Sequence, residues 1–176
     1  MVQQVELKRG LRDVYFDDTQ LSNVIGDIGR LIYRGYDIHD LAENSTFEET
    51  VYLMMHGELP TQAQLSAFED SLRAARPIPQ EVVDVIAKVQ KAHPMDVLRT
   101  AVSGLSSLDE GINGNSRQAS LARGVRLIAV APTIVAAHER IRSGKNPIAP
   151  RADLGHAANF LYMLFGQEPD PQDADL

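Results

Sequence analysis

Five histidines are the side chains of this sequence best suited to acid–base or metal chemistry: His39, His56, His93, His138 and His156. No two of them stand three or four residues apart, so no pair can meet on one helical face to bind a metal ion. His56 and His138 are expected late in helices, where an imidazole interacts favourably with the helix dipole. We interpret the histidines as structural and expect no metal site. His156 is expected either in the core or at an interface.

Three arginines, Arg117, Arg123 and Arg126, precede a long uncharged run, and the last two share a helical face. Guanidinium groups bind phosphates through paired hydrogen bonds, so the cluster could hold an anionic ligand. The alternative, which we favour, is a solvated face ahead of a buried segment. Cysteine is absent from the sequence, which excludes a thiolate nucleophile, a thiolate metal site and a disulfide framework.

The composition is that of a globular protein, with 176 residues, 44% of them hydrophobic and 23% charged. This length predicts one domain or part of a larger one. The net charge of −7 argues against non-specific binding to nucleic acids or anionic membranes. Residues 1–10 are polar, unlike a signal peptide, and the uncharged run is too short to span a bilayer. We therefore expect a cytoplasmic protein with no nucleic-acid or membrane partner.

The uncharged run, residues 127–137, lies in the predicted central helix of residues 117–143. A helix that is apolar on all sides must be buried on all sides, either by its own chain or by a second subunit. Pro132 stands in the middle of the run and removes one backbone hydrogen bond. Either the helix bends there or it breaks into two; we favour a bend, because the apolar pattern continues on both sides. Gly144 is the predicted helix stop.

The other elements follow from local signals. Residues 19–25 and 30–36 have strand character around a glycine-rich turn, which predicts a hairpin. Ser45 or Thr46 can form a capping box with Glu48 or Glu49. Asp153 is expected to cap a last helix that ends at Phe165. The remaining predicted elements are a helical turn at 38–43, helices that begin near Thr61, Val82 and Met95, and a mobile loop at 109–116. We divide the chain into a hairpin segment (1–37), a helical part (38–166) and an acidic tail (167–176).

Several strings together resemble the N-terminal, large-domain portion of citrate synthases. They are Gly29-Arg-Leu-Ile-Tyr-Arg-Gly-Tyr-Asp-Ile38, Leu41-Ala42-Glu43, Thr46-Phe-Glu-Glu49, Tyr52-Leu-Met-Met-His-Gly-Glu-Leu-Pro-Thr61, His93-Pro-Met-Asp-Val-Leu-Arg-Thr-Ala-Val-Ser103, the run at 127–137 and Asn159-Phe-Leu-Tyr-Met163. The resemblance covers residues 21 to 167 approximately, in the family's own order. It implies a mainly α fold, a multihelical large-domain bundle with a small N-terminal β-hairpin.

The resemblance also implies a function. The family condenses acetyl-CoA, or propionyl-CoA in 2-methylcitrate synthases, with oxaloacetate and releases CoA, which makes the acyl-CoA a substrate and requires no cofactor. The family works as a homo-oligomer, at least a dimer. The helices resembling those of this chain pack on their symmetry mates. Candidate interface residues are therefore Met95, Leu98, Ala101, Val102, Leu105, Leu127, Val130, Ile134 and Ala137.

The family's catalytic motifs, His-Gly-Gly-Ala and Gly-His-Arg-Val, do not occur in this sequence. The resemblance therefore carries over no catalytic residue and leaves the substrate-binding residues unknown. We expect the chain to serve as scaffold and dimer interface, inactive without the remaining C-terminal part of the enzyme. The alternative is a non-catalytic helical oligomerisation or regulatory module derived from the family. In either case an apolar patch should be exposed on the isolated chain.

Overall fold

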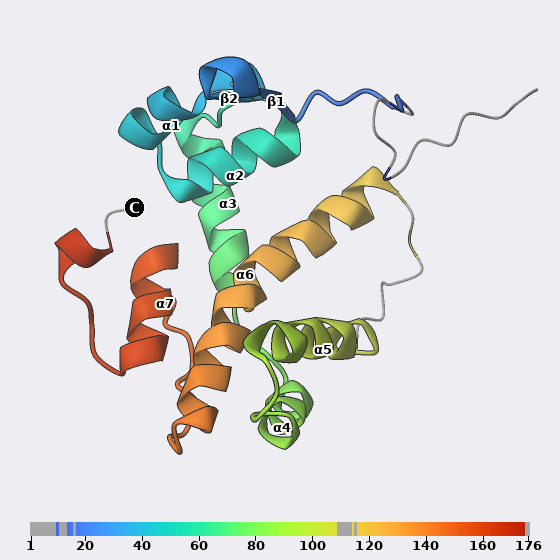
Figure 1. Ribbon diagram of the computed structural model, residues 1–176. Helices are drawn as coiled ribbons and strands as arrows, with labels where there is room; N and C mark the ends of the chain where they lie inside the picture. The colour runs from blue at the N-terminus through green and yellow to red at the C-terminus, as the bar shows by residue number, and fades with distance from the viewer. Residues whose placement is uncertain (1–9, 11–13, 16, 109–113, 115, 175–176) are drawn as a thin grey trace, which may run out of the picture. The chain divides into compact units, whose positions relative to one another are not determined.

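A computed structural model describes residues 10, 14–15, 17–108, 114 and 116–174 (Figure 1). The chain divides into two compact units, Met1–Asn44 and Ser45–Leu176. The sequence analysis placed residues 38–44 with the helical part, whereas here they belong to the first unit. Each unit is described by itself.

The first unit contains the predicted hairpin. Strand β1 (Ser22–Ile25) pairs antiparallel with β2 (Arg30–Tyr33), and the 3-10 turn η2 (Gly26–Ile28) connects them. A third strand that we did not predict, β3 (Tyr36–Asp37), pairs with β2 through a turn in which Arg34 and Gly35 both have positive φ. Helix α1 (Ile38–Asn44) follows. Among the described residues of this unit, Leu41 is the one buried apolar side chain.

The second unit is helical. It contains α2 (Phe47–His56), α3 (Gln62–Ala75), α4 (Gln80–Lys88), α5 (Pro94–Ser106), α6 (Arg117–Arg142), α7 (His156–Phe165) and the short 3-10 helix η3 (Pro171–Asp173). Two capping boxes begin α2 and α3. The Thr46 hydroxyl accepts the Glu49 N–H while the Glu49 carboxylate accepts the Thr46 N–H. Thr61 and Gln64 form the same arrangement. The prediction of a mainly α fold with a small hairpin is confirmed.

Helix α6 is the centre of the unit. It packs against α3, α4, α5 and α7, and Figure 1 shows α7 on one side of it and α4 and α5 on the other. Pro132 lies inside the helix, which continues past it without a break. The helix ends as predicted at Gly144, where φ is +72° and the Lys145 N–H bonds the Arg140 carbonyl at 2.8 Å. These are the bonds of a glycine-terminated helix end.

Two apolar clusters surround α6. The larger joins α4, α5 and α6 through Val82, Ile86, Val97, Ala101, Leu105, Val130, Ile134 and Ala137. The smaller centres on Phe68, Leu72 and Ala129 and joins α2, α3 and α6. The middle of α6 therefore contacts other helices on several sides, as an uncharged helix requires.

The length of α6 corrects one expectation. With 26 residues and a mean hydropathy of 1.4 over its most apolar stretch, it is long and apolar enough to cross a membrane by length and composition alone. The uncharged run alone is too short for that, but the helix also includes residues 117–126 ahead of the run. The helix packs on four other helices, and 28% of its most apolar stretch is buried among the described residues of this chain.

The start of α7 corrects a second expectation, that Asp153 caps this helix. Gly155, not Asp153, is the N-cap residue. The Asp153 carboxylate instead accepts a hydrogen bond from the Arg151 guanidinium at 2.9 Å, and Arg151 also bonds Glu168 at 2.7 Å. The Asp153 carboxylate therefore binds Arg151 and does not cap α7. The predicted mobile loop, 109–116, lies for the most part outside the described residues.

Candidate functional site

An apolar groove of about 520 Å³ runs over the middle of α6, between α2 and α7. We call it the apolar groove, and its lining residues are Phe47, Ile128, Ala131, Pro132, Val135, His156, Ala157 and Phe160. Phe47 comes from the start of α2, four residues come from α6 and three from α7. Apart from the imidazole of His156, the lining side chains are hydrocarbon.

His156 closes one end of the groove through contacts with α2. Its ring stacks on Phe47 with the centroids 4.9 Å apart and an angle of 21° between the planes. Its backbone N–H donates to the Glu48 carboxylate at 3.1 Å. Because Gly155 has no side chain to cap α7, this carboxylate from α2 supplies the cap in its place.

Burial governs the charge of His156. Desolvation lowers the pKa of its imidazole below the usual value, and nearby Arg76 lowers it further, while Glu48 partly opposes the shift. Within the part of the chain that the structure describes, the buried Nδ1 atom has no hydrogen-bond partner. The structure thus favours the neutral imidazole, and the apolar groove carries no formal charge.

Arg76 holds the segment that leads into α7. Its side chain is only 2% exposed, and its Nη1 donates to the carbonyls of Arg151 and Leu154, both at 2.8 Å. Its own carbonyl accepts the Thr133 hydroxyl of α6 at 3.0 Å. The side chain of Asn159 in α7 accepts the Arg151 N–H at 2.8 Å. This network joins α3, α6 and α7 and places α7 alongside the groove.

Sequence reasoning missed this network, although a signal for Arg76 was present. Leu65, Phe68 and Leu72 line the buried face of α3, and Arg76 follows at the next helical interval. The spacing therefore put a charged residue on the apolar face, and a buried charge requires partners. Nothing in the sequence identified these partners, because they are backbone carbonyls more than 70 positions away.

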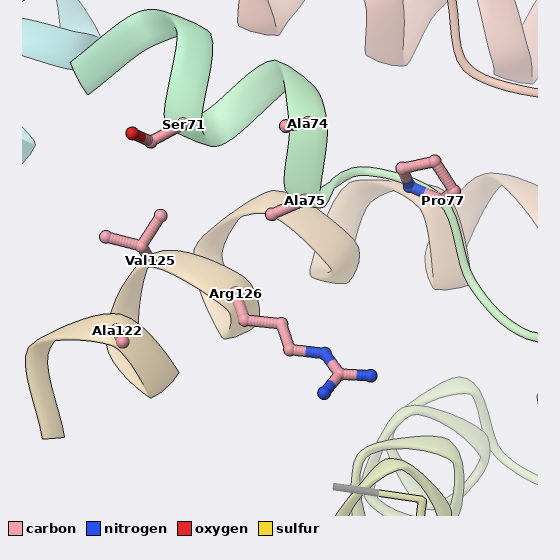
Figure 2. A pocket seen from close by; sticks show the side chains of 7 residues that line it. All are labelled: Ser71, Ala74, Ala75, Pro77, Ala122, Val125 and Arg126. Atoms are coloured by element: carbon pink, nitrogen blue, oxygen red, sulfur yellow. The ribbon is translucent and has the colours of Figure 1, made fainter. Parts of the chain in front are cut away.

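The three arginines of the predicted cluster have different surroundings. Arg117 is exposed, and Arg123 donates to the Gly114 carbonyl. Arg126 lines a second cleft of about 510 Å³, together with small or short side chains of α3 and α6: Ser71, Ala74, Ala75, Pro77, Ala122 and Val125. Figure 2 shows Arg126 as the one long side chain of this cleft. The solvated face stays a prediction.

Three of the other four histidines have side-chain contacts within the fold, and His39 donates its backbone N–H to the Asp37 carboxylate at 3.0 Å. His56 stacks on Tyr52 with a centroid distance of 4.2 Å, and the His93 Nδ1 accepts the Met95 N–H at the start of α5. His138 is buried in α6, with its Nε2 3.1 Å from the Gln90 carbonyl. Within the described residues, no three potential ligand side chains gather into a metal site.

Comparison with known proteins shows the family of this chain. A family model described as "Citrate synthase, C-terminal domain" matches residues 10–176. The chain belongs to the citrate synthase family. It is 44% identical to a citrate synthase of Haloferax volcanii over 170 residues, 94% of this chain and 45% of that protein. It is 42% identical to a 2-methylcitrate synthase of Mycobacterium tuberculosis over 94% of this chain and 42% of that one.

Solved structures show the same likeness. The chain resembles a citrate synthase from Pyrobaculum aerophilum with a TM-score of 0.91 and 36% identity, over 99% of this chain and 49% of that one. A Thermoplasma acidophilum citrate synthase, solved as a ternary complex with carboxymethyl coenzyme A and oxaloacetate, shares the fold at a TM-score of 0.90. The chain spans less than half the length of the curated citrate synthases that it matches.

The structure divides the citrate synthase interface candidates into three groups by burial. Five of them belong to the chain's own core: Ala101, Leu105, Val130, Ile134 and Ala137. Leu98 and Val102 are half-buried against that core, whereas Met95 and Leu127 are 63% and 44% exposed. In an interface through these helices, Met95 and Leu127 would contact the second copy directly. The five buried residues would only support these helices from the core. The dimer itself stays a prediction.

Proposed function

We propose that this chain is the N-terminal, large-domain portion of an enzyme that condenses acetyl-CoA or propionyl-CoA with oxaloacetate to give citrate or 2-methylcitrate and free CoA. The observation that carries the proposal is the 44% identity to a citrate synthase across 94% of this chain. The matched relatives include both citrate and 2-methylcitrate synthases, so the proposal includes both acyl donors.

The proposed role of the chain within that enzyme is to be a scaffold. The condensation needs a carboxylate to remove a methyl proton and hydrogen-bond donors to stabilise the enolate and polarise the ketone. No carboxylate lines the apolar groove, and a neutral His156 is its one titratable group. The nearby Glu48 already accepts a hydrogen bond from the start of α7. These features support packing as the function of the groove. They do not support catalysis there.

The scaffold proposal includes self-association, as a homo-oligomer of at least two copies. The family resemblance supports it, because the matching helices of the family pack on their symmetry mates. Met95 on α5 and Leu127 on α6 are exposed and open to such a contact.

The test is an assay of the purified 176-residue chain. Acetyl-CoA or propionyl-CoA is mixed with oxaloacetate, and the released thiol is measured with Ellman's reagent. We expect no protein-dependent release, whereas the complete Haloferax volcanii enzyme run in parallel shows that the assay works. Turnover that rises with the concentration of the pure chain would refute the scaffold role.

A further inference from the structure

We propose that the apolar groove binds the apolar face of a helix. This helix belongs to the part of the citrate synthase fold that this chain does not contain. The inference rests on the proposed function and names the surface through which the chain joins the rest of the enzyme. The occupant is a polypeptide segment of that remaining part.

The first support is the chemistry of the groove. The lining residues Ile128, Ala131, Pro132 and Val135 recur at helical spacing on one side of α6. The first three are half-buried and Val135 is exposed, so α2 and α7 cover this side only in part. Val135 is 40% exposed and Phe47 44%. A small-molecule site adds a few convergent polar groups to an apolar pocket, and the lining residues here offer only one imidazole. Such a surface fits other apolar side chains.

The second support is the extent of the surface. A neighbouring hollow of about 510 Å³ shares Val135 and Phe160 with the apolar groove and reaches Leu164 and Phe165 at the end of α7. The rest of its lining is polar: Glu139, Arg140, Ser143 and Lys145. Phe165 is 66% exposed. The surface along α6 and α7, which pack side by side (Figure 1), therefore continues past the groove with an apolar edge on α7 and a polar edge at the end of α6. A helix with apolar residues at intervals of three and four fits a surface of this shape.

The third support concerns the source of the occupant. The Pyrobaculum aerophilum structure superposes on 99% of this chain, yet this chain accounts for only 49% of that one. About half of the relative's chain therefore has no counterpart here, and it is the proposed source of the occupant. A second copy is the competing occupant, and the dilution dependence of labelling in the experiment below separates the two.

The experiment uses a single thiol as a probe, since the chain has no cysteine of its own. Val135→Cys places the thiol in the groove. The matched control is Ala63→Cys, which places the thiol at an exposed position of α3. Each variant is prepared as the 176-residue chain and as a chimera, in which the unmatched part of the Haloferax volcanii citrate synthase follows this chain. The labelling by Ellman's reagent of the chimera without the substitution is subtracted from that of each chimeric variant.

We expect the groove thiol to react in the isolated chain and to react at least about tenfold more slowly in the chimera, because a buried thiol reacts only after local opening. The control thiol should react at similar rates in both. Equal rates for the groove thiol in chain and chimera would overturn the proposal. Slow labelling in the isolated chain that becomes faster on dilution would also overturn it, because the occupant would then be a second copy.

A second measurement requires no chimera. Ala157→Trp should fill the groove, and Ala63→Trp adds the same side chain elsewhere. We expect Ala157→Trp to reduce the fluorescence of the apolar dye 8-anilinonaphthalene-1-sulfonate on the isolated chain by about half relative to the control. Equal dye binding would overturn the proposal.

The two proposals can fail separately. A chimera that protects the groove thiol but releases no CoA contradicts the proposed function alone. A chimera that releases CoA with an unprotected groove thiol contradicts the docking surface alone.

Discussion

Arg76 shows how one residue can fix the position of a helix far away in the sequence. Its guanidinium is buried, and desolvation, reinforced by nearby Arg73, lowers its pKa while Glu48 opposes the shift. An arginine still keeps its charge, because its ordinary pKa is too far above neutrality for such an effect to remove the proton. The charge is stabilised by two carbonyls of the segment before α7. Arg76 is therefore a positioning residue for one wall of the groove.

Replacing Arg76 tests this role. Arg76→Met keeps an unbranched side chain but leaves two buried carbonyls without their donor, so we expect a loss of about 2–4 kcal/mol in the free energy of unfolding. Urea denaturation followed by circular dichroism measures it. Arg73→Met is the control, since its ion pairs with Glu69 and Asp70 lie near the surface and should contribute less than about 1 kcal/mol. Equal effects of the two substitutions would contradict the assignment.

His156 predicts a pH dependence of stability. Its pKa is lowered in the folded chain, so between the unfolded value of about 6.5 and the folded value the unfolded chain binds a proton that the folded chain does not. The stabilisation is therefore complete above the unfolded pKa and is lost as the pH falls through that window. Glu48 and Arg76 are the charged groups that act on the imidazole.

We expect His156→Phe, which can keep the stack on Phe47, to lose less stability than the parent chain between pH 7.5 and pH 5. The difference between the two urea midpoints at each pH isolates this histidine from the other four. A pH profile that the substitution leaves unchanged would show that His156 is not the titrating group.

At the scale of the element, α6 combines a buried and an open side along one helix. Val130, Ile134 and Ala137 face α4 and α5 in the core, while Leu127 and Val135 are exposed. An uncharged run such as residues 127–137 does not show which sides of the helix are covered by the chain itself. The two sides should respond differently to truncation.

Ile134→Ala removes a fully buried side chain, and we expect it to cost about 2–5 kcal/mol of stability through the cavity that it leaves. Leu127→Ala should change stability by less than about 1 kcal/mol, because the side chain is 44% exposed. Thermal or urea unfolding at low protein concentration compares them. A large loss for Leu127→Ala would place that residue in the core.

Local signals predicted the elements well, because they act between neighbours in the chain. The glycines at 26 and 29 indicated the hairpin, and Thr46 with Glu49 indicated the start of α2. Asp153 was assigned wrongly because its actual partner, Arg151, competes for the same carboxylate. The groove was not predictable in detail, since it depends on contacts that bring Phe47, Pro132 and Phe160 together. Such contacts leave no periodic pattern.

At the scale of the whole molecule, the two units differ in how they are stabilised. Both apolar clusters lie in residues 45–176, whereas the described part of residues 1–44 buries Leu41 alone among its apolar side chains. We therefore expect residues 45–176, produced alone, to unfold in one cooperative transition with the helical circular dichroism of the parent. Residues 1–44 alone should show no such transition. A non-cooperative 45–176 fragment would show that its folding depends on the first unit.

Glu48 belongs to the first turn of α2 and also bonds the first N–H of α7, 108 positions later. The N-termini of α2 and α7 thus share one negatively charged side chain. At the start of α7, no local side chain caps the helix in its place. In a newly synthesised chain, α7 therefore depends on an earlier helix to define where it starts. We expect the order of assembly to follow from this dependence, with the last helix forming only against an α2 that already exists.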